Sequence, residues 1–526
     1  MLTMAPAYNP YADVRLCDIL VSFRMVDVDA AALALPFSSG ECQLSQIWQT
    51  HDLVEYQSLK LASLERDYFK LDGTFILPEE DLTGLQTGWW SDAISGEDKS
   101  FDARPSLGFS WNENQTSVGF TLCFDDASGM YASLFRVSAY DLEGNLIQEK
   151  LVENSSARCI VDMPTENYRY VVIEFLETSE AWRRIRITEV LFGIVQYFDR
   201  ENTVSASIEY GFSPMSESLP ASELTLVLDN SDAVWNMVNP RGVYAYLQQS
   251  QPLDVWFYVG TPDESFNWNK EETAVYMGRY YFTTAVAEDD SMTAKITAHD
   301  NIYRLEGKKY RNGTSGQWTI FQAISAVIEY SGTNLAFEMP EEIGSRLVGK
   351  NLPKDCTCRE AIRLLTQAAC SACYVNREGM LIFFDPLIDR TPVDTINYDN
   401  MSAMPKIAVA GKVNLVELSV KDEYTAGGVE TIYVASDIGI DEQEQAAAIS
   451  NPVAVSGETV AAWLLEMLQR RLTYNVSERG NPAREITDVA VIWDAYGENR
   501  PAVISRQRFN FDGGLKCETE AWGGGF

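Results

Sequence analysis

Apolar and polar residues alternate along most of this chain, and this alternation predicts β-strands. In residues 118–124, Val118, Phe120, Leu122 and Phe124 share one face, and small or polar residues lie between them. Because successive side chains of a strand point to opposite faces, the two-residue period indicates half-buried strands. The other stretches expected to form strands are 12–35, 33–44, 135–147, 170–176, 185–187, 224–228, 253–259, 275–282, 292–298, 374–384, 413–420 and 429–434.

The period changes from two to 3.6 at three places, and there it predicts amphipathic helices. Thr319 can cap the first helix, and Thr357 with Glu360 forms a capping box that opens the second. The expected buried stripes are Ile320, Ala323, Ile324, Val327 and Ile328; then Ile362, Leu365 and Ala369; then Val460, Trp463, Leu464, Met467 and Leu468.

The order of these patterns divides the chain into segments of different type. A length of 526 residues predicts three or four domains at about 100–200 residues each. Short strands with turn signals from 51 to 193 predict a sandwich or jelly roll, and residues 196–305 a small barrel. Residues 310–390 combine two helices with a hairpin and predict a compact α/β unit, after which strands return from 400 to 526.

Composition excludes several classes of function. The net charge of −35 repels phosphate groups, so binding through neutralised DNA phosphates is not expected. No apolar run approaches the roughly 20 residues that cross a bilayer, and the N-terminus lacks the basic start and apolar core of a secretory signal. The nine cysteines are odd in number, and most of them lie among apolar neighbours. Both observations favour reduced core thiols in a protein made in the cytosol.

No familiar set of catalytic groups stands out. The two histidines, His51 and His299, lie far apart, and no Gly-x-Ser-x-Gly motif or phosphate loop accompanies them. Cysteines 356, 358, 370 and 373 form the one metal-like set, but a helix of about 12 residues, roughly 18 Å long, separates the two pairs. We therefore expect no catalytic residues, no metal and no cofactor; a glycoside hydrolase that uses two carboxylates stays an open alternative.

Aromatic residues gather near polar ones in the first β-rich segment. Trp89, Trp90, Asp92 and Trp111 form this group. Aromatic faces beside carboxylates are one way in which proteins hold sugar rings, so these four residues are the candidate carbohydrate site. The alternative is that the tryptophans pack in the core of a β-sandwich.

A succession of short motifs resembles a known family. They are LERDYFKLDG at 64–73, GWWS at 88–91, VGFTLCF at 118–124, LPASEL at 219–224, LDN at 228–230 and ITAHD at 296–300, followed by the helix capped at Thr357, the hairpin ending in Gly379-Met380-Leu381, and residues 507–515 with Phe511-Asp512-Gly513-Gly514. In this order, over most of the chain, they resemble the central tail hub (baseplate hub) proteins of tailed bacteriophages and phage-tail-like particles.

The resemblance implies a mainly β fold with a smaller α/β domain. Residues 1–48 plus 196–305 would form a first hub-type β-barrel, 49–195 an inserted galactose-binding-like (discoidin-like) jelly roll, 306–395 an α/β linker domain, and 396–526 a second hub-type barrel with one helix.

The resemblance also implies a structural, non-enzymatic role. The family forms a homotrimeric ring at the virion tail tip, which joins the tail tube to the tip and lets DNA or cargo pass. Expected partners are distal tail, tail tube and tape measure proteins, together with tail fibre or receptor-binding proteins and a host surface glycan; no sequence-specific nucleic acid is expected. The alternative is a carbohydrate-binding, receptor-recognition protein that uses the inserted jelly roll.

Overall fold

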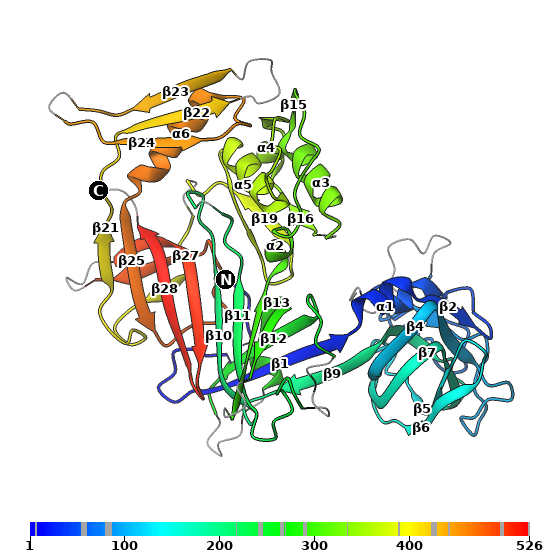
Figure 1. Cartoon of the computed structure of the whole chain (residues 1–526). Coiled ribbons are helices and arrows are strands. Elements are labelled where there is room, and N and C mark those ends of the chain that lie inside the picture. The colour runs from blue at the N-terminus through cyan, green and yellow to red at the C-terminus, as the bar shows by residue number, and fades with distance from the viewer. Residues whose placement is uncertain are drawn as a thin grey trace. The chain divides into compact units, whose positions relative to one another are not determined.

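The computed structural model confirms a mainly β protein, with 45% of residues in strands and 12% in helices (Figure 1). It describes residues 1–5, 8–53, 60–78, 87–216, 218–239, 243, 246–262, 268, 270–287, 292–333, 335–387, 390–421, 429–439, 442–494 and 499–523. The chain separates into two compact units, residues 23–196 with 245–251, and residues 1–22 with 197–244 and 252–526. The finer domain boundaries expected from the sequence stay a prediction.

The largest element is a sheet of 13 strands, whose main path runs β21-β25-β28-β27-β10-β11-β14-β13-β12-β1-β9, with β26 and β20 branching from β27. Its strands are β1 (Leu16–Val26), β9 (Gly193–Phe198), β10 (Thr203–Gly211), β11 (Glu223–Asp229), β12 (Pro252–Gly260), β13 (Ala274–Val286), β14 (Thr293–His299), β20 (Asp394–Ile396), β21 (Lys406–Val409), β25 (Leu472–Glu478), β26 (Val489–Trp493), β27 (Asn499–Phe511) and β28 (Leu515–Gly523).

The pairing of β10 with β27 joins two segments that lie about 300 residues apart in the sequence. The strands are antiparallel, and Ile208 faces Phe509 across the pair. Both side chains are fully buried, so this junction carries part of the core as well as the ladder of hydrogen bonds. Within the described residues the strands expected for two barrels thus form one open sheet, and no closed barrel is seen.

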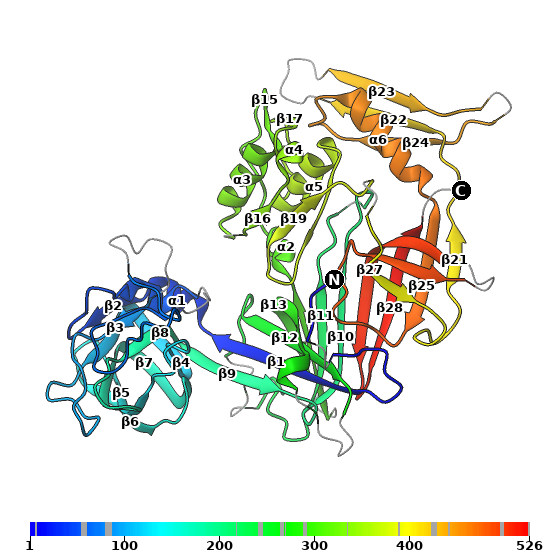
Figure 2. The ribbon, with the colours of Figure 1, turned by 180° about the vertical axis from the view of Figure 1, so that it is seen from behind.

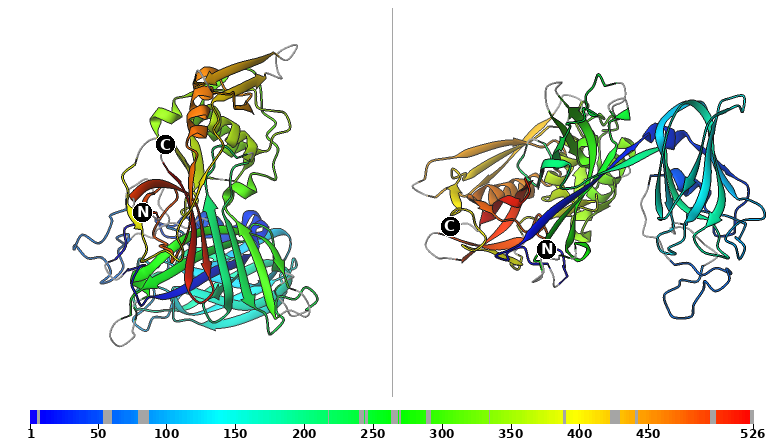
Figure 3. Two further views of the ribbon diagram at one scale, coloured as in Figure 1. Left: turned by 90° about the vertical axis from the view of Figure 1, so that its left-hand side faces the viewer. Right: turned by 90° about the horizontal axis from the view of Figure 1, so that it is seen from below.

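The unit that contains residues 23–196 is built on a sheet of seven strands, in the order β3-β8-β4-β7-β5-β6 with β2 beside β4. Figure 3 shows these strands in cyan and blue, curving around a common interior. Aromatic and aliphatic side chains fill that interior. The strands are β2 (Leu35–Ser38), β3 (Trp89–Trp90), β4 (Ser106–Phe124), β5 (Ala132–Tyr140), β6 (Leu146–Glu153), β7 (Arg158–Thr178) and β8 (Arg186–Leu191).

Helices and short strands between residues 300 and 470 form the remaining layers (Figure 2). Helices α3 and α5 contact each other, and α6 lies against β22 and β23, so each small sheet has a helix against it. The elements are α2 (Asn301–Arg304), β15 (Gln317–Thr319), α3 (Ile320–Ser331), β16 (Phe337–Glu338), α4 (Glu341–Gly344), β17 (Leu347–Gly349), α5 (Cys358–Ala368), β18 (Ala372–Val375), β19 (Leu381–Phe384), β22 (Leu415–Lys421), β23 (Glu430–Ser436), β24 (Ala446–Ser450) and α6 (Gly457–Gln469). The 3₁₀ turn η3 (Glu271–Thr273) lies earlier in the chain, between β12 and β13.

One expected strand is in fact partly helical. Residues 27–34 lie inside the stretch 12–35, but the structure has helix α1 (Val28–Leu33) there. The Asp27 side chain accepts a hydrogen bond from the amide of Ala30, which is the geometry of an N-cap. The run of alanines that follows favours a helix over a strand, and this local preference outweighs the alternation on which the prediction rested.

Candidate functional site

The three tryptophans of the predicted sugar site lie inside the seven-stranded unit. Trp89 is 0% exposed, Trp90 2% and Trp111 4%. Trp89 stacks on Phe175 with 5.6 Å between ring centroids, and Trp111 donates from its indole nitrogen to the carbonyl of Ala30 at 2.7 Å. No indole face is left on which a sugar could stack, so their placement gives the predicted carbohydrate contact no support; Asp92 is exposed.

Trp90 covers a buried charge. The Arg186 guanidinium lies 4.0 Å from the Trp90 ring centroid and 4.4 Å from that of Tyr68. It forms an ion pair with the buried Glu65 and a 3.6 Å contact with Asp125. Because a buried charge is stable only when it is paired and hydrogen-bonded, this cluster fixes the segment around Glu65 and Tyr68 to strand β8. Its role is structural.

A second cluster, around Trp182 in loops of the same unit, is partly exposed. Trp182 is half-buried and has a φ of +62°, a left-handed conformation that is uncommon for a bulky residue. The Arg66 guanidinium lies 5.2 Å from the centre of its ring. The neighbouring Arg183 is 8% exposed and forms a 3.2 Å ion pair with Glu180, whose side chain is mostly exposed.

The polar groups of this loop cluster are only partly used. Arg183 donates to the carbonyl of Arg66 at 2.7 Å, which joins the two loops. Its Nε has no hydrogen-bond partner among the described residues. The cluster thus combines a half-buried indole with the exposed Arg66 guanidinium and the exposed Glu180 carboxylate, a donor and an acceptor of the kinds that bind the hydroxyls of a saccharide. Sequence patterns did not indicate this cluster, because the left-handed backbone of Trp182 is visible only in the structure.

A row of paired charges crosses the 13-stranded sheet on its polar face. Arg506 of β27 forms an ion pair with Glu209 of β10, and Arg508 lies 4.0 Å from the same carboxylate. In the register of β27 and β28, Arg506 also faces Glu520, and Arg508 faces Glu518. We call these five residues the charge ladder. Each arginine on it has carboxylates on both sides.

Two clefts of about 320 and 310 Å³ lie along the charge ladder and share Glu209, Arg506 and Glu520. The first also has the aromatic side chains of Phe212 and Trp522 in its wall. Among the described residues no histidine or cysteine lines either cleft, so the clefts offer space and paired charge without a thiol or an imidazole base.

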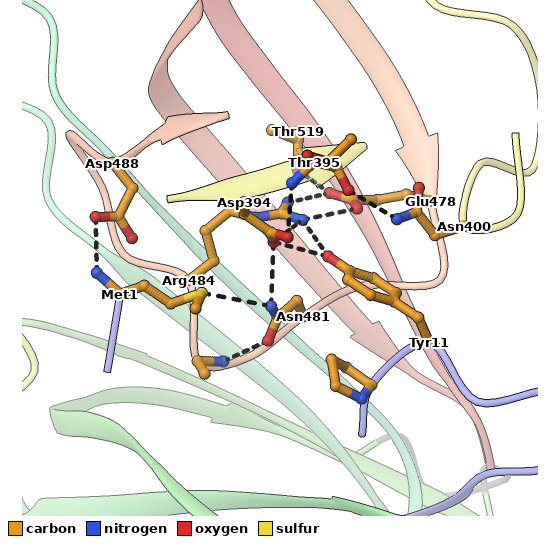
Figure 4. Close-up of polar contacts among 12 residues, drawn as sticks. Met1, Tyr11, Asp394, Thr395, Asn400, Glu478, Asn481, Arg484, Asp488 and Thr519 are labelled. Carbon is orange, nitrogen blue, oxygen red and sulfur yellow. Dashed lines mark hydrogen bonds and ion pairs between the residues drawn. The ribbon is translucent and has the colours of Figure 1, made fainter. Parts of the chain in front are cut away.

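A buried ion network ties the first residues of the chain to the end of the same unit (Figure 4). Arg484 is fully buried between Glu478 and Asp394, with 2.9 Å to the Asp394 carboxylate. Tyr11 donates to Asp394 at 2.8 Å, and the Tyr8 hydroxyl donates to Asn481 at 2.6 Å. Burial raises the pKa of Asp394, but Arg484 and the hydrogen bonds from Tyr11 and Arg484 outweigh it and hold that pKa below its usual value. This network joins the N-terminal residues to strands β20 and β25.

Each of the two histidines packs against an aromatic ring. His51 packs edge-on against Phe109, and burial lowers its pKa. His299 stacks on Tyr303 at 4.3 Å, and its Nδ1 lies 2.9 Å from the hydroxyl of Thr283. Burial lowers the pKa of His299 also, and the nearby Glu223 offsets this only in part. Both imidazole rings therefore contribute to the packing of the fold.

The four cysteines of the metal-like set are buried thiols. Burial raises the pKa of Cys373 to about 12 and that of Cys370 to about 11, so neither is a thiolate at neutral pH. In the part of the chain that the structure describes, no group of three or more His, Cys, Asp or Glu residues is placed to hold a metal ion. None of the described helices combines the length and apolar character needed to cross a membrane.

The chain is similar in structure to phage tail proteins. The tail protein from Neisseria meningitidis MC58 matches 62% of this chain and 93% of its own, at 10% identity and a TM-score of 0.43. The 43 kDa tail protein of prophage MuSo2 from Shewanella oneidensis matches 62% and 95%, at 15% identity and a TM-score of 0.42. The resemblance expected from the order of sequence motifs is thereby confirmed as a structural similarity.

A smaller part of the chain is similar to carbohydrate-binding modules. A fucose binding module from Streptococcus pneumoniae matches 30% of this chain and 88% of its own, at 13% identity and a TM-score of 0.18. No family model and no curated protein matches the sequence. At these identities and TM-scores the similarities do not say what this chain binds, because one fold hosts many functions.

Proposed function

We propose that this chain is a structural hub protein of the tail tip of a phage or phage-tail-like particle. Three copies form a ring that joins the tail tube to the tip, and DNA or cargo passes through it. Tail tube and tape measure proteins are its neighbours, and the two hub-type barrels are completed by contacts between copies. No catalytic activity is expected, and incubation with cell-wall polymers should release no reducing sugar.

The charge ladder is the observation that carries this proposal. A wall along which DNA slides must not present free cations, because each cation that neutralises a phosphate adds to affinity. On this sheet face every arginine of the ladder is already opposed by carboxylates, and the chain as a whole carries a net charge of −35. A phosphate backbone would find no unpaired arginine along the ladder.

The test is to unpair the arginines. The unmodified protein should not retain double-stranded DNA in a filter-binding assay at 50 mM salt. The double variant Glu209→Gln and Glu520→Gln removes both carboxylates beside Arg506 and leaves Arg508 facing Glu518 alone. It should bind DNA with an affinity that falls steeply with salt. The matched control is Glu417→Gln with Glu430→Gln, which removes two exposed carboxylates from β22 and β23. Tight DNA binding by the unmodified chain would refute a lumen wall of this kind.

We propose, as a second function, that the loop cluster of Trp182, Arg66, Arg183 and Glu180 binds a saccharide of the host surface. The apolar face of a sugar ring can replace the Arg66 guanidinium over the indole, while its hydroxyls bond to the mostly exposed Glu180 carboxylate, which Arg183 holds in place. Charges of both signs lie close together here, which favours a neutral sugar over an anionic one. This proposal keeps the predicted role of the jelly roll in receptor recognition. It assigns that role to residues other than Trp89, Trp90, Asp92 and Trp111.

This second function is tested with the full chain on a glycan array, followed by titration calorimetry of any saccharide retained. Trp182→Ala and Glu180→Gln should each weaken binding at least tenfold. Trp48→Ala is the matched control, because Trp48 is an exposed indole elsewhere in the same unit. If Trp48→Ala abolishes binding and Trp182→Ala does not, the site is misplaced.

A further inference from the structure

Strand β21 lies at one edge of the 13-stranded sheet. It pairs with β25 alone among the described strands, so the backbone groups along its other edge have no partner strand. All four of its residues are exposed, including Ile407 at 45% and Val409 at 51%. An exposed edge with β-branched residues is a template for pairing with another chain.

Strand β23 is a second open edge with the same character. It pairs with β22 alone among the described strands. Its inner face is covered, since the ring of Tyr433 lies directly over Gly457 at the start of α6. Its outer face presents Ile432 at 59% exposure and Val434 at 55%. One face of this small sheet is therefore covered by α6, and the other face leaves apolar side chains exposed to solvent.

The two edges match in spacing and in charge. Each carries two β-branched residues two positions apart, so Ile407 and Val409 can face Val434 and Ile432 in an antiparallel pair, or Ile432 and Val434 in a parallel one. Lys406 begins β21 and Lys412, which pairs with Glu442 in its own chain, follows it, while β23 begins at Glu430 and is followed by Asp437. In either direction the flanking charges that approach each other have opposite sign, which favours this partner over a copy of the same edge.

We infer that β21 of one copy pairs with β23 of a second copy. The contact uses two different surfaces, so each copy gives one edge and receives the other; such head-to-tail contacts close into rings when the rotation allows. The inference rests on the proposed function, because it names the surface by which the copies of the hub associate. Strand β9, the edge at the far end of the large sheet, fits less well, because it exposes Tyr197 as its one large apolar side chain.

Engineered cysteines test this pairing directly in the full chain. Ile407→Cys, Val434→Cys and Ile432→Cys are made separately, purified under reducing conditions, mixed in pairs and oxidised. The mixture of Ile407→Cys with Val434→Cys should give a covalent dimer if the strands are antiparallel, and that of Ile407→Cys with Ile432→Cys if they are parallel. Each variant alone should give none, since the contact joins unlike edges.

The native cysteines and random collisions are controlled by the unmodified chain and by Val286→Cys, an exposed position at the end of β13. A trimer by light scattering with no cross-link in either mixture overturns the inference and leaves the hub proposal standing. Cross-links by each variant alone also overturn it, because they would show like edges meeting. A monomer at all concentrations removes the hub proposal and this inference together.

Discussion

At the scale of single residues, charge is handled in two different ways. Arg484 and Arg186 are buried and held by carboxylates on the inside of their units, where losing one partner would leave an unpaired charge in a low dielectric at a cost of about 3–5 kcal/mol. The arginines of the charge ladder are exposed, and such pairs contribute about 0–1 kcal/mol. The buried pairs therefore maintain the fold, and the exposed ones define how the surface meets a partner.

The Asp394 carboxylate should make stability depend on pH. Its pKa is depressed in the folded chain, so its contribution is present above the unfolded value of about 3.9 and is lost as pH falls through the folded value. We expect the unfolding temperature of the protein to fall between about pH 5 and pH 3. Asp394→Asn should be less stable at pH 7 and should lose part of this slope, measured by calorimetry across that range.

Asp141→Asn is the control for this prediction. Asp141 also has a depressed pKa, through hydrogen bonds from Asn145, but it is fully exposed in a turn, where solvent screening leaves little net effect. Its variant should follow the unmodified protein. A pH slope that is the same in Asp394→Asn and in the unmodified protein would show that the buried network does not control acid stability.

The tryptophans show what a sequence can and cannot say about a site. Trp89, Trp90 and Trp111 stand beside polar residues in the sequence, and that neighbourhood is compatible with either a sugar site or a core. Which applies depends on the strand pairing of β3 and β4 within the unit, which places all three rings inside. No sequence pattern singles out Trp182, because its partial exposure and its left-handed backbone depend on the loops around it.

At the scale of elements, local rules predicted most of what formed. Periodicity and caps identified α3, α5 and α6 and the long strands, because both signals are written in neighbouring residues. Of the capping box expected at Thr357 and Glu360, the structure shows one half: the Thr357 side chain accepts a hydrogen bond from the Glu360 amide. The full reciprocal pair occurs at α3, between Thr319 and Gln322.

The capping box of α3 should be measurable. Thr319→Ala removes the acceptor for the Gln322 amide, a change that typically costs about 1 kcal/mol, and should speed amide exchange in residues 320–331, measured by hydrogen-exchange mass spectrometry. Ser456→Ala is a matched control, since Ser456 stands at the N-cap of α6 without a side-chain cap bond. Equal effects of the two substitutions would contradict the assignment.

At the scale of the whole molecule, the sequence could not show that the expected barrels share one sheet. The β10 and β27 strands lie about 300 residues apart, and their register depends on how the intervening segments fold. Periodicity is blind to such long-range pairing, so two barrels and one open sheet fit the same pattern. The open sheet matters because it leaves edges that a second copy can complete.

The central claim, that copies of this chain form a ring, is tested most directly by measuring mass. Light scattering during size-exclusion chromatography of the full chain, followed by negative-stain imaging of the same peak, gives both the number of copies and their arrangement. With a chain mass of 59.0 kDa, the hub proposal predicts a trimer that images as a closed ring with a central opening. A monodisperse monomer from low to high micromolar concentration would contradict it.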